Sequence, residues 1–97
     1  MLFTVNKSPF TTDNMTSCLK FAKSDTPILL YEDGVYAAQA GTKVEAEIKE
    51  AASKIEIYAL KEDLQARGID KLIDGIKTVD YSGFVDLVEK HHTCHWI

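Results

Sequence analysis

The sequence is poor in the residues that crosslink or interrupt a chain. Its 97 residues include two cysteines, two prolines and five glycines. Cys18 and Cys94 lie far apart, and a single such pair is not a disulfide framework, so we expect both to be thiols. A hydrophobic content of 45% supplies a core without disulfide or metal staples. No linker, internal repeat or low-complexity tract divides the chain, and we expect one domain over residues 1–97.

Basic residues are in the minority, and long apolar runs are absent. Eleven lysines and arginines stand against fifteen acidic residues, a net charge of −4, which argues against a surface that binds nucleic acid phosphates. The longest apolar run, residues 27–31, is far shorter than the roughly 20 residues that cross a bilayer. The first residues carry neither a basic leader nor the apolar stretch of a signal peptide. We therefore expect a cytoplasmic protein that contacts neither membrane nor nucleic acid directly.

Strands and helices are predicted to alternate along the chain. Short apolar segments between turn residues favour strands, at residues 2–5, 28–31, 55–60, 76–79 and 94–97. Helical periodicity and helix formers favour helices, at residues 12–23, 35–40 continued by 44–52, 62–67 and 83–91. This alternation predicts an α/β fold in which a mostly parallel, four- to five-stranded sheet is flanked by helices.

Capping residues are predicted for most of these helices. Thr12 or Asp13 is expected to cap the first helix, Thr42 to form a capping box with Glu45, and Ser82 to cap the last helix. Gly68 is expected to end the helix over residues 62–67. The apolar residues of the last helix, Phe84, Val85, Leu87 and Val88, are expected to point inward.

In parallel sheets the chemistry usually lies beyond the carboxyl ends of the strands. Those ends are predicted at residues 6–8, 32–34, 61–63 and 80–82, and most of their charges are acidic. Glu32 and Asp33 could act as an acid/base pair. The segment Glu32-Asp33-Gly34 is equally typical of a turn, and turn chemistry favours that structural interpretation.

Sequence motifs for nucleotide, nucleophile and metal chemistry are missing. The chain has no G-x-G-x-x-G, no Walker lysine motif and no G-x-S-x-G. His91, His92, Cys94 and His95 are possible metal ligands, but no second group of ligands follows at the spacing of zinc sites. Histidines at the end of a helix are the simpler interpretation. We predict neither a metal nor a cofactor.

Cys18 is the remaining candidate for chemistry. It shares the apolar stripe of its predicted helix with Met15, Leu19 and Ala22, which favours a small core residue. Its place in the first two turns of that helix, close to several lysines, is also a setting that favours a reactive thiolate. Both interpretations stay open at this point, and Cys94 is the weaker candidate of the two cysteines.

Four segments, in the same order, resemble the DsrH/TusB family of sulfur-relay proteins. They are MLFTVNKSPF at residues 1–10, LYEDGVYAA at 30–38, YALKEDLQARG at 58–68 and VDYSGFVDL at 79–87. The resemblance extends to Trp96 and implies a DsrE-like α/β fold.

The resemblance also implies a function within a complex. Family members form a heterohexamer with DsrE/TusD-like and DsrF/TusC-like subunits. Such complexes take persulfide sulfur from a TusA-like carrier or pass it to a DsrC/TusE-like acceptor, in sulfur oxidation or in 2-thiolation of the tRNA wobble uridine. The chemistry is thiol exchange, which needs neither metal nor nucleotide. The chain would then be a sulfur-transfer subunit and not an independent enzyme.

For Cys18 the resemblance leaves two roles. DsrH proteins of sulfur oxidisers carry a cysteine on the first helix, which Cys18 resembles, whereas enteric TusB proteins can lack it; this favours the DsrH branch. The main sulfur-carrying cysteine belongs to the DsrE/TusD subunit, after its third strand, and residues 59–63 here contain none. Cys18 is therefore either an auxiliary persulfide carrier or a structural thiol in a scaffold subunit. A stand-alone enzyme that uses Glu32 and Asp33 is the third alternative.

Overall fold

The protein is described by a computed structural model that covers residues 1–10, 14–23 and 25–96. Its centre is a five-stranded sheet with the order β4-β3-β2-β1-β5, in which every neighbouring pair is parallel. The strands are β1 (Leu2–Val5), β2 (Ile28–Leu30), β3 (Ile57–Leu60), β4 (Lys77–Val79) and β5 (Thr93–Trp96). The predicted fold class is thereby confirmed.

Helical segments connect the strands, as parallel pairing requires. They are α1 (Asn14–Phe21), the 3₁₀ helix η1 (Glu32–Ala38), α2 (Glu45–Ala52), α3 (Lys61–Ala66) and α4 (Tyr81–Lys90). The segment predicted as a helix over residues 35–40 is thus a 3₁₀ helix that starts directly after β2, so the prediction was wrong in both type and bounds. No helix within the described ranges has the length and apolar character needed to cross a membrane.

One face of the sheet carries the main hydrophobic core. There α1, η1, α2 and α3 pack on alternate residues of the inner strands. The buried cluster includes Phe3, Val5, Ile28, Leu30, Ile57 and Ala59 from the strands, Met15 and Cys18 from α1, Ile48 from α2, and Leu64 from α3. Because successive strand residues point to opposite faces, the residues between them belong to the other face.

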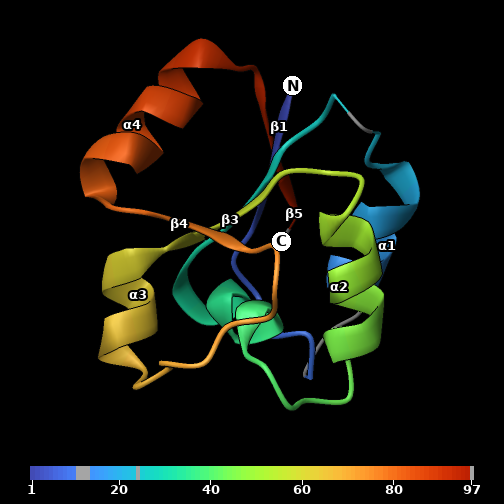
Figure 1. The fold of residues 1–97 in the computed structure, drawn as a ribbon. Helices are drawn as coiled ribbons and strands as arrows, with labels where there is room; N and C mark the ends of the chain where they lie inside the picture. Colours follow the sequence, from blue (N-terminus) through green and yellow to red (C-terminus); the bar gives the residue numbers. More distant parts are fainter. Residues whose placement is uncertain (11–13, 24, 97) are drawn as a thin grey trace.

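The other face of the sheet is covered by α4. Leu2, Leu29 and Leu60 are buried but lie outside the main cluster, and Figure 1 shows α4 on the opposite side of β3 and β4 from α3. A right-handed return from β4 to β5 places the helix there. No residue of α4 is buried in this chain, and Val88 is 37% exposed. The prediction that Val88 points inward was therefore wrong, whereas Phe84, Val85 and Leu87 are partly buried.

The helix caps differ from the predicted ones in two places. Asp80, and not Ser82, caps α4, since its Oδ1 accepts a hydrogen bond from the Gly83 N–H at 2.9 Å. The capping box predicted at α2 between Thr42 and Glu45 is displaced by one residue, to Gly41. Glu45 accepts from the N–H of Gly41 at 2.7 Å, and α2 has no side-chain cap at its own N-terminus. Thr12 and Asp13 lie outside the described residues.

The predicted end of α3 at Gly68 is confirmed. Gly68 has a φ of 67°, the left-handed conformation that glycine adopts without strain. Its N–H donates to the Gln65 carbonyl at 3.2 Å, and the N–H of Ile69 donates to the Leu64 carbonyl at 3.0 Å. This pair of bonds is the Schellman ending of a helix, and the burial of Leu64 and Ile69 in one cluster completes it.

The cap of α4 gives a direct test of the fold. Asp80→Ala removes the acceptor for the Gly83 N–H and should lower the free energy of unfolding by about 1 kcal/mol. Ser82→Ala is the matched control, with an expected change below about 0.5 kcal/mol as for an ordinary surface position. Urea denaturation followed by circular dichroism measures both. An equal loss in the two variants would contradict the assignment of Asp80 as the cap.

Candidate functional site

The carboxyl edge of the sheet is the candidate site, because all strands end there in the same direction. Asn6 follows β1, Tyr31 follows β2, Lys61 follows β3 and Asp80 follows β4. The strand order also reverses at β1, since the chain moves outward from β1 to β4 and then returns to the far side of β1. Ligands of open α/β sheets bind at such a reversal. The structure therefore brings together the four loops that the sequence predicted at this edge.

The turn after β2 packs tightly on the end of β1. Tyr31 donates its N–H to the Val5 carbonyl at 3.1 Å. Gly34 lies so close to Val5 that a Cβ atom would overlap the same carbonyl oxygen. Glu32 adopts a φ of 48°, which is unusual for a residue other than glycine. Its N–H donates to Oδ2 of Asp63 at 2.6 Å, so the conformation of the turn is fixed from α3.

Arg67 joins this turn to α3 with a second set of contacts. Its Nε and Nη2 both donate to Oδ1 of Asp33, at 3.0 and 2.9 Å, and its Nη1 lies 3.6 Å from a carboxylate oxygen of Asp63. Arg67 is the sole arginine of the sequence, and its side chain is only 22% exposed. Local sequence patterns do not reveal this contact, because Arg67 and Asp33 are 34 positions apart.

These contacts decide between the two interpretations of the acidic rim. Asp33 is engaged by a guanidinium, and the backbone of Glu32 is held by Asp63. The turn interpretation of Glu32-Asp33-Gly34 is thus the one that the geometry supports.

Three aromatic rings meet at the same edge, one from the end of β2 and two from the start of α4. The rings of Tyr31 and Phe84 lie edge to face with centroids 5.8 Å apart, and Phe84 stacks with Tyr81 at 5.9 Å. Burial raises the pKa of the Tyr31 hydroxyl, while a hydrogen bond with the side chain of Thr4 opposes that shift. The N–H of Tyr81 donates to a carboxylate oxygen of Glu62 at 3.2 Å. The start of α4 is therefore fixed to both β2 and α3.

Asn6 places a side-chain oxygen without a hydrogen-bond donor at this edge. Its Oδ1 is buried, and no hydrogen-bond donor of the described residues reaches it. A buried acceptor without a partner costs about 1–3 kcal/mol. The sequence analysis placed Asn6 in the loop after the first strand but gave it no role.

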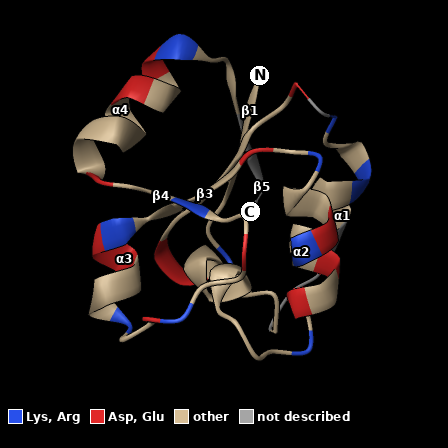
Figure 2. Ribbon diagram, in the orientation of Figure 1, with Lys and Arg blue, Asp and Glu red and all other residues tan. Residues whose placement is uncertain are grey.

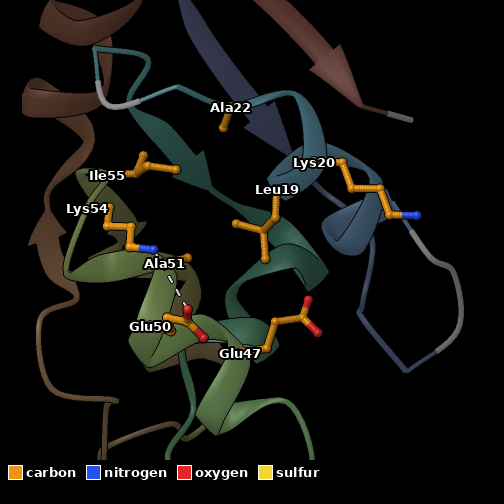
Figure 3. A pocket seen from close by; sticks show the side chains of 8 residues that line it. All are labelled: Leu19, Lys20, Ala22, Glu47, Glu50, Ala51, Lys54 and Ile55. Carbon is orange, nitrogen blue, oxygen red and sulfur yellow. Dashed lines mark ion pairs between the residues drawn. The ribbon is translucent and has the colours of Figure 1, made fainter.

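Cys18 lies elsewhere. Its side chain is 0% exposed, in the core between α1 and the sheet. A groove of about 460 Å³ runs between α1 and α2, and Cys18 does not line it. Figure 3 shows the lining residues, which are Leu19, Lys20, Ala22, Glu47, Glu50, Ala51, Lys54 and Ile55. Cys18, the site residue predicted from the sequence, is therefore not accessible at the surface.

The other candidate ligands give no metal site in the part of the chain that the structure describes. No group of three or more histidine, cysteine, aspartate or glutamate side chains there is arranged so that it could hold a metal ion. The side chains of Cys94 and His95 lie outside the described part.

A family model described as "DsrH like protein" matches residues 7–94 of the chain. The chain belongs to the DsrH family. Relatives of this DsrH-family chain include Protein TusB of Photorhabdus laumondii, 38% identical over 93 residues that cover 95% of both proteins. Protein TusB of Shigella flexneri is also 38% identical, over 94% of both proteins.

Solved structures share the fold of this DsrH-family chain at low sequence identity. The ychN protein of E. coli matches with a TM-score of 0.79 and 18% identity, over 95% of this chain and 94% of the other. A protein of unknown function from Methanobacterium thermoautotrophicum matches with a TM-score of 0.72 and 16% identity, over 97% and 96%. These likenesses establish the fold.

The role of Arg67 can be tested by removing its charge. Arg67→Met should lower the free energy of unfolding by about 1 kcal/mol, because the exposed carboxylate of Asp33 loses its hydrogen-bond donor and the partly buried carboxylate of Asp63 loses its counter-charge. Lys54→Met is the control. It breaks the exposed pair with Glu50 and should cost less than about 0.5 kcal/mol. Urea denaturation measures both variants, and equal costs would show that Arg67 does not hold the edge.

Proposed function

We propose that this DsrH-family chain is a subunit of a sulfur-relay complex. The observation that carries the proposal is the family match over residues 7–94, supported by TusB relatives that are 38% identical along nearly the whole chain. We infer that its partners are DsrE/TusD-like and DsrF/TusC-like subunits, and that the complex works in the cytoplasm without direct contact with nucleic acid or membrane. Cys18 favoured the DsrH branch of sulfur oxidisers, but the TusB names of the relatives favour thiolation of the tRNA wobble uridine over sulfur oxidation.

The chemistry proposed for the complex is persulfide exchange. The thiolate of the receiving cysteine attacks the outer sulfur of a donor persulfide. A new S–S bond forms as the donor S–S bond breaks, and the donor cysteine leaves as a thiolate. The step transfers one sulfur atom without an external oxidant or reductant. A receiving thiol must be reachable by the donor and ionised at neutral pH.

The burial of Cys18 supports a scaffold role for this subunit. A thiol that is 0% exposed behind α1 cannot meet the persulfide of another protein without displacement of that helix. The contacts of Asp33, Asp63 and Arg67 likewise hold the carboxyl edge in one arrangement. We therefore propose that the chain supports the complex and leaves the carrier cysteine to another subunit. A carrier role for Cys18 stays a prediction of the family resemblance.

Assembly and transfer test the relay role. Co-expression with DsrE/TusD-like and DsrF/TusC-like subunits of the same genome should give one complex in size-exclusion chromatography with light scattering. With a persulfidated TusA-like donor, a DsrC/TusE-like acceptor should gain about 32 Da per sulfur atom in intact mass spectrometry. Omission of this chain should abolish the transfer. Equal transfer by the other subunits without it would refute the proposal.

The role of Cys18 needs a separate measurement. In a Cys94→Ala background, Cys18 is the sole thiol of the chain. It should resist a bulky maleimide in the folded complex and react fully after denaturation, because burial protects it. Cys18→Ala should leave sulfur transfer to the acceptor unchanged. Sulfur found on Cys18 after incubation with the donor, together with loss of transfer in Cys18→Ala, would establish the carrier role instead.

A further inference from the structure

The start of α4 presents an aromatic surface to solvent. Tyr81 is 64% exposed although its ring stacks on Phe84, with an angle of 12° between the two planes. Phe84 in turn packs against Tyr31 at the end of β2. The exposed ring is therefore held in place by two others, which lowers the entropy lost when a partner covers it.

The apolar surface of α4 continues beyond Tyr81. Val85 and Val88 follow it at the i, i+4 and i+7 positions, so the three side chains form one stripe. Phe84 and Leu87 lie on the neighbouring stripe. These two residues and Val85 are partly buried, whereas Tyr81 and Val88 are exposed. The sheet thus covers only part of the apolar surface of α4. We name the stripe of Tyr81, Val85 and Val88 the α4 flank.

Carboxylates border the α4 flank. Asp80 and Glu62 both lie at its amino-terminal end, where each accepts one backbone N–H of α4. Both residues are exposed, and an ionised carboxylate has further acceptor positions for a second donor. Asp86 and Glu89 are exposed residues of the same helix and add negative charge to it. Figure 2 shows acidic and basic segments on both α3 and α4. The cations on these two helices are Lys61 and Lys90.

We propose that the α4 flank docks a basic segment of a partner protein, one that carries arginine or lysine beside apolar side chains. A guanidinium stacks on an exposed tyrosine ring and binds carboxylates with two parallel hydrogen bonds. The apolar neighbours of that arginine would cover Val85 and Val88. The charge disfavours a second copy of this chain, whose net charge is −4, and it disfavours nucleic acid for the same reason. The inference deepens the proposed function, since the partner would be a component of the relay.

A pair of peptides tests the surface directly. The isotope-labelled full chain is titrated with a short peptide of alternating arginine and leucine and, separately, with its counterpart in which glutamate replaces arginine. The basic peptide should shift the amide signals of residues 80–88 and of Glu62, and its affinity should fall as salt is added. Equal binding of the acidic peptide would overturn the proposal. So would the absence of shifts, or shifts confined to the groove between α1 and α2.

Substitutions test the contributions of the Tyr81 ring and of the carboxylates separately. Tyr81→Ala should weaken binding of the basic peptide about tenfold. The double variant Asp80→Asn, Glu62→Gln removes two charges but keeps an amide oxygen for each capped N–H, and it should also weaken binding about tenfold. Phe21→Ala removes a ring of similar exposure, 65%, on α1 and should leave binding unchanged. If Phe21→Ala has the same effect as Tyr81→Ala, binding is unspecific and the proposal fails.

Binding measurements on the relay complex distinguish this inference from the proposed function. If the wild-type chain assembles with the relay subunits and donors, the double variant should bind one of these components, the partner with the basic segment, about tenfold more weakly. Unchanged affinity of every component for the double variant would overturn the docking proposal and leave the relay role intact. If the wild-type chain joins no relay complex, the proposed function fails, and the peptide titration still decides whether the α4 flank recognises basic segments.

Discussion

The need to cover both faces of a parallel sheet governs this protein. β1 lies at the reversal of the strand order, and all four of its residues are buried. α1, η1, α2 and α3 close one face around a continuous core, whereas α4 covers the other among the described helices. This ten-residue helix leaves part of its apolar surface exposed, at Tyr81 and Val88. The surface available to a partner is thus a consequence of the topology.

The charged residues at the carboxyl edge of the sheet also stabilise the fold. Asp63 accepts a hydrogen bond from the N–H of Glu32, and Arg67 donates to Asp33. The carboxylates of Asp80 and Glu62 accept hydrogen bonds from backbone N–H groups of α4. These contacts connect the loops after β2, β3 and β4 to one another. The acidic rim, for which the sequence favoured a structural interpretation over acid/base catalysis, therefore connects three loops.

This arrangement agrees with a subunit that acts through its surfaces. A sulfur carrier needs a thiolate that other proteins reach, and Cys18 is instead part of the packing beneath α1. In the proposed function, persulfide exchange takes place on another chain, and this chain contributes the carboxyl edge and the α4 flank. The chain belongs to the DsrH family, and its described thiol, Cys18, is buried. Both observations are consistent with a subunit that does not itself carry sulfur.

The sequence by itself determined the order of strands and helices, because each short apolar run between turn residues is a local pattern. It also determined the parallel sheet, the ending at Gly68 and, through four matching segments, the family. Tertiary structure decided what depends on contacts distant in sequence: the pairing of Arg67 with Asp33, the choice of Asp80 over Ser82 as a cap, and the burial of Cys18. Local periodicity places Cys18 on an apolar stripe, but only the packing of α1 on the sheet sets its exposure to zero, because solvent access is a property of all neighbouring elements together.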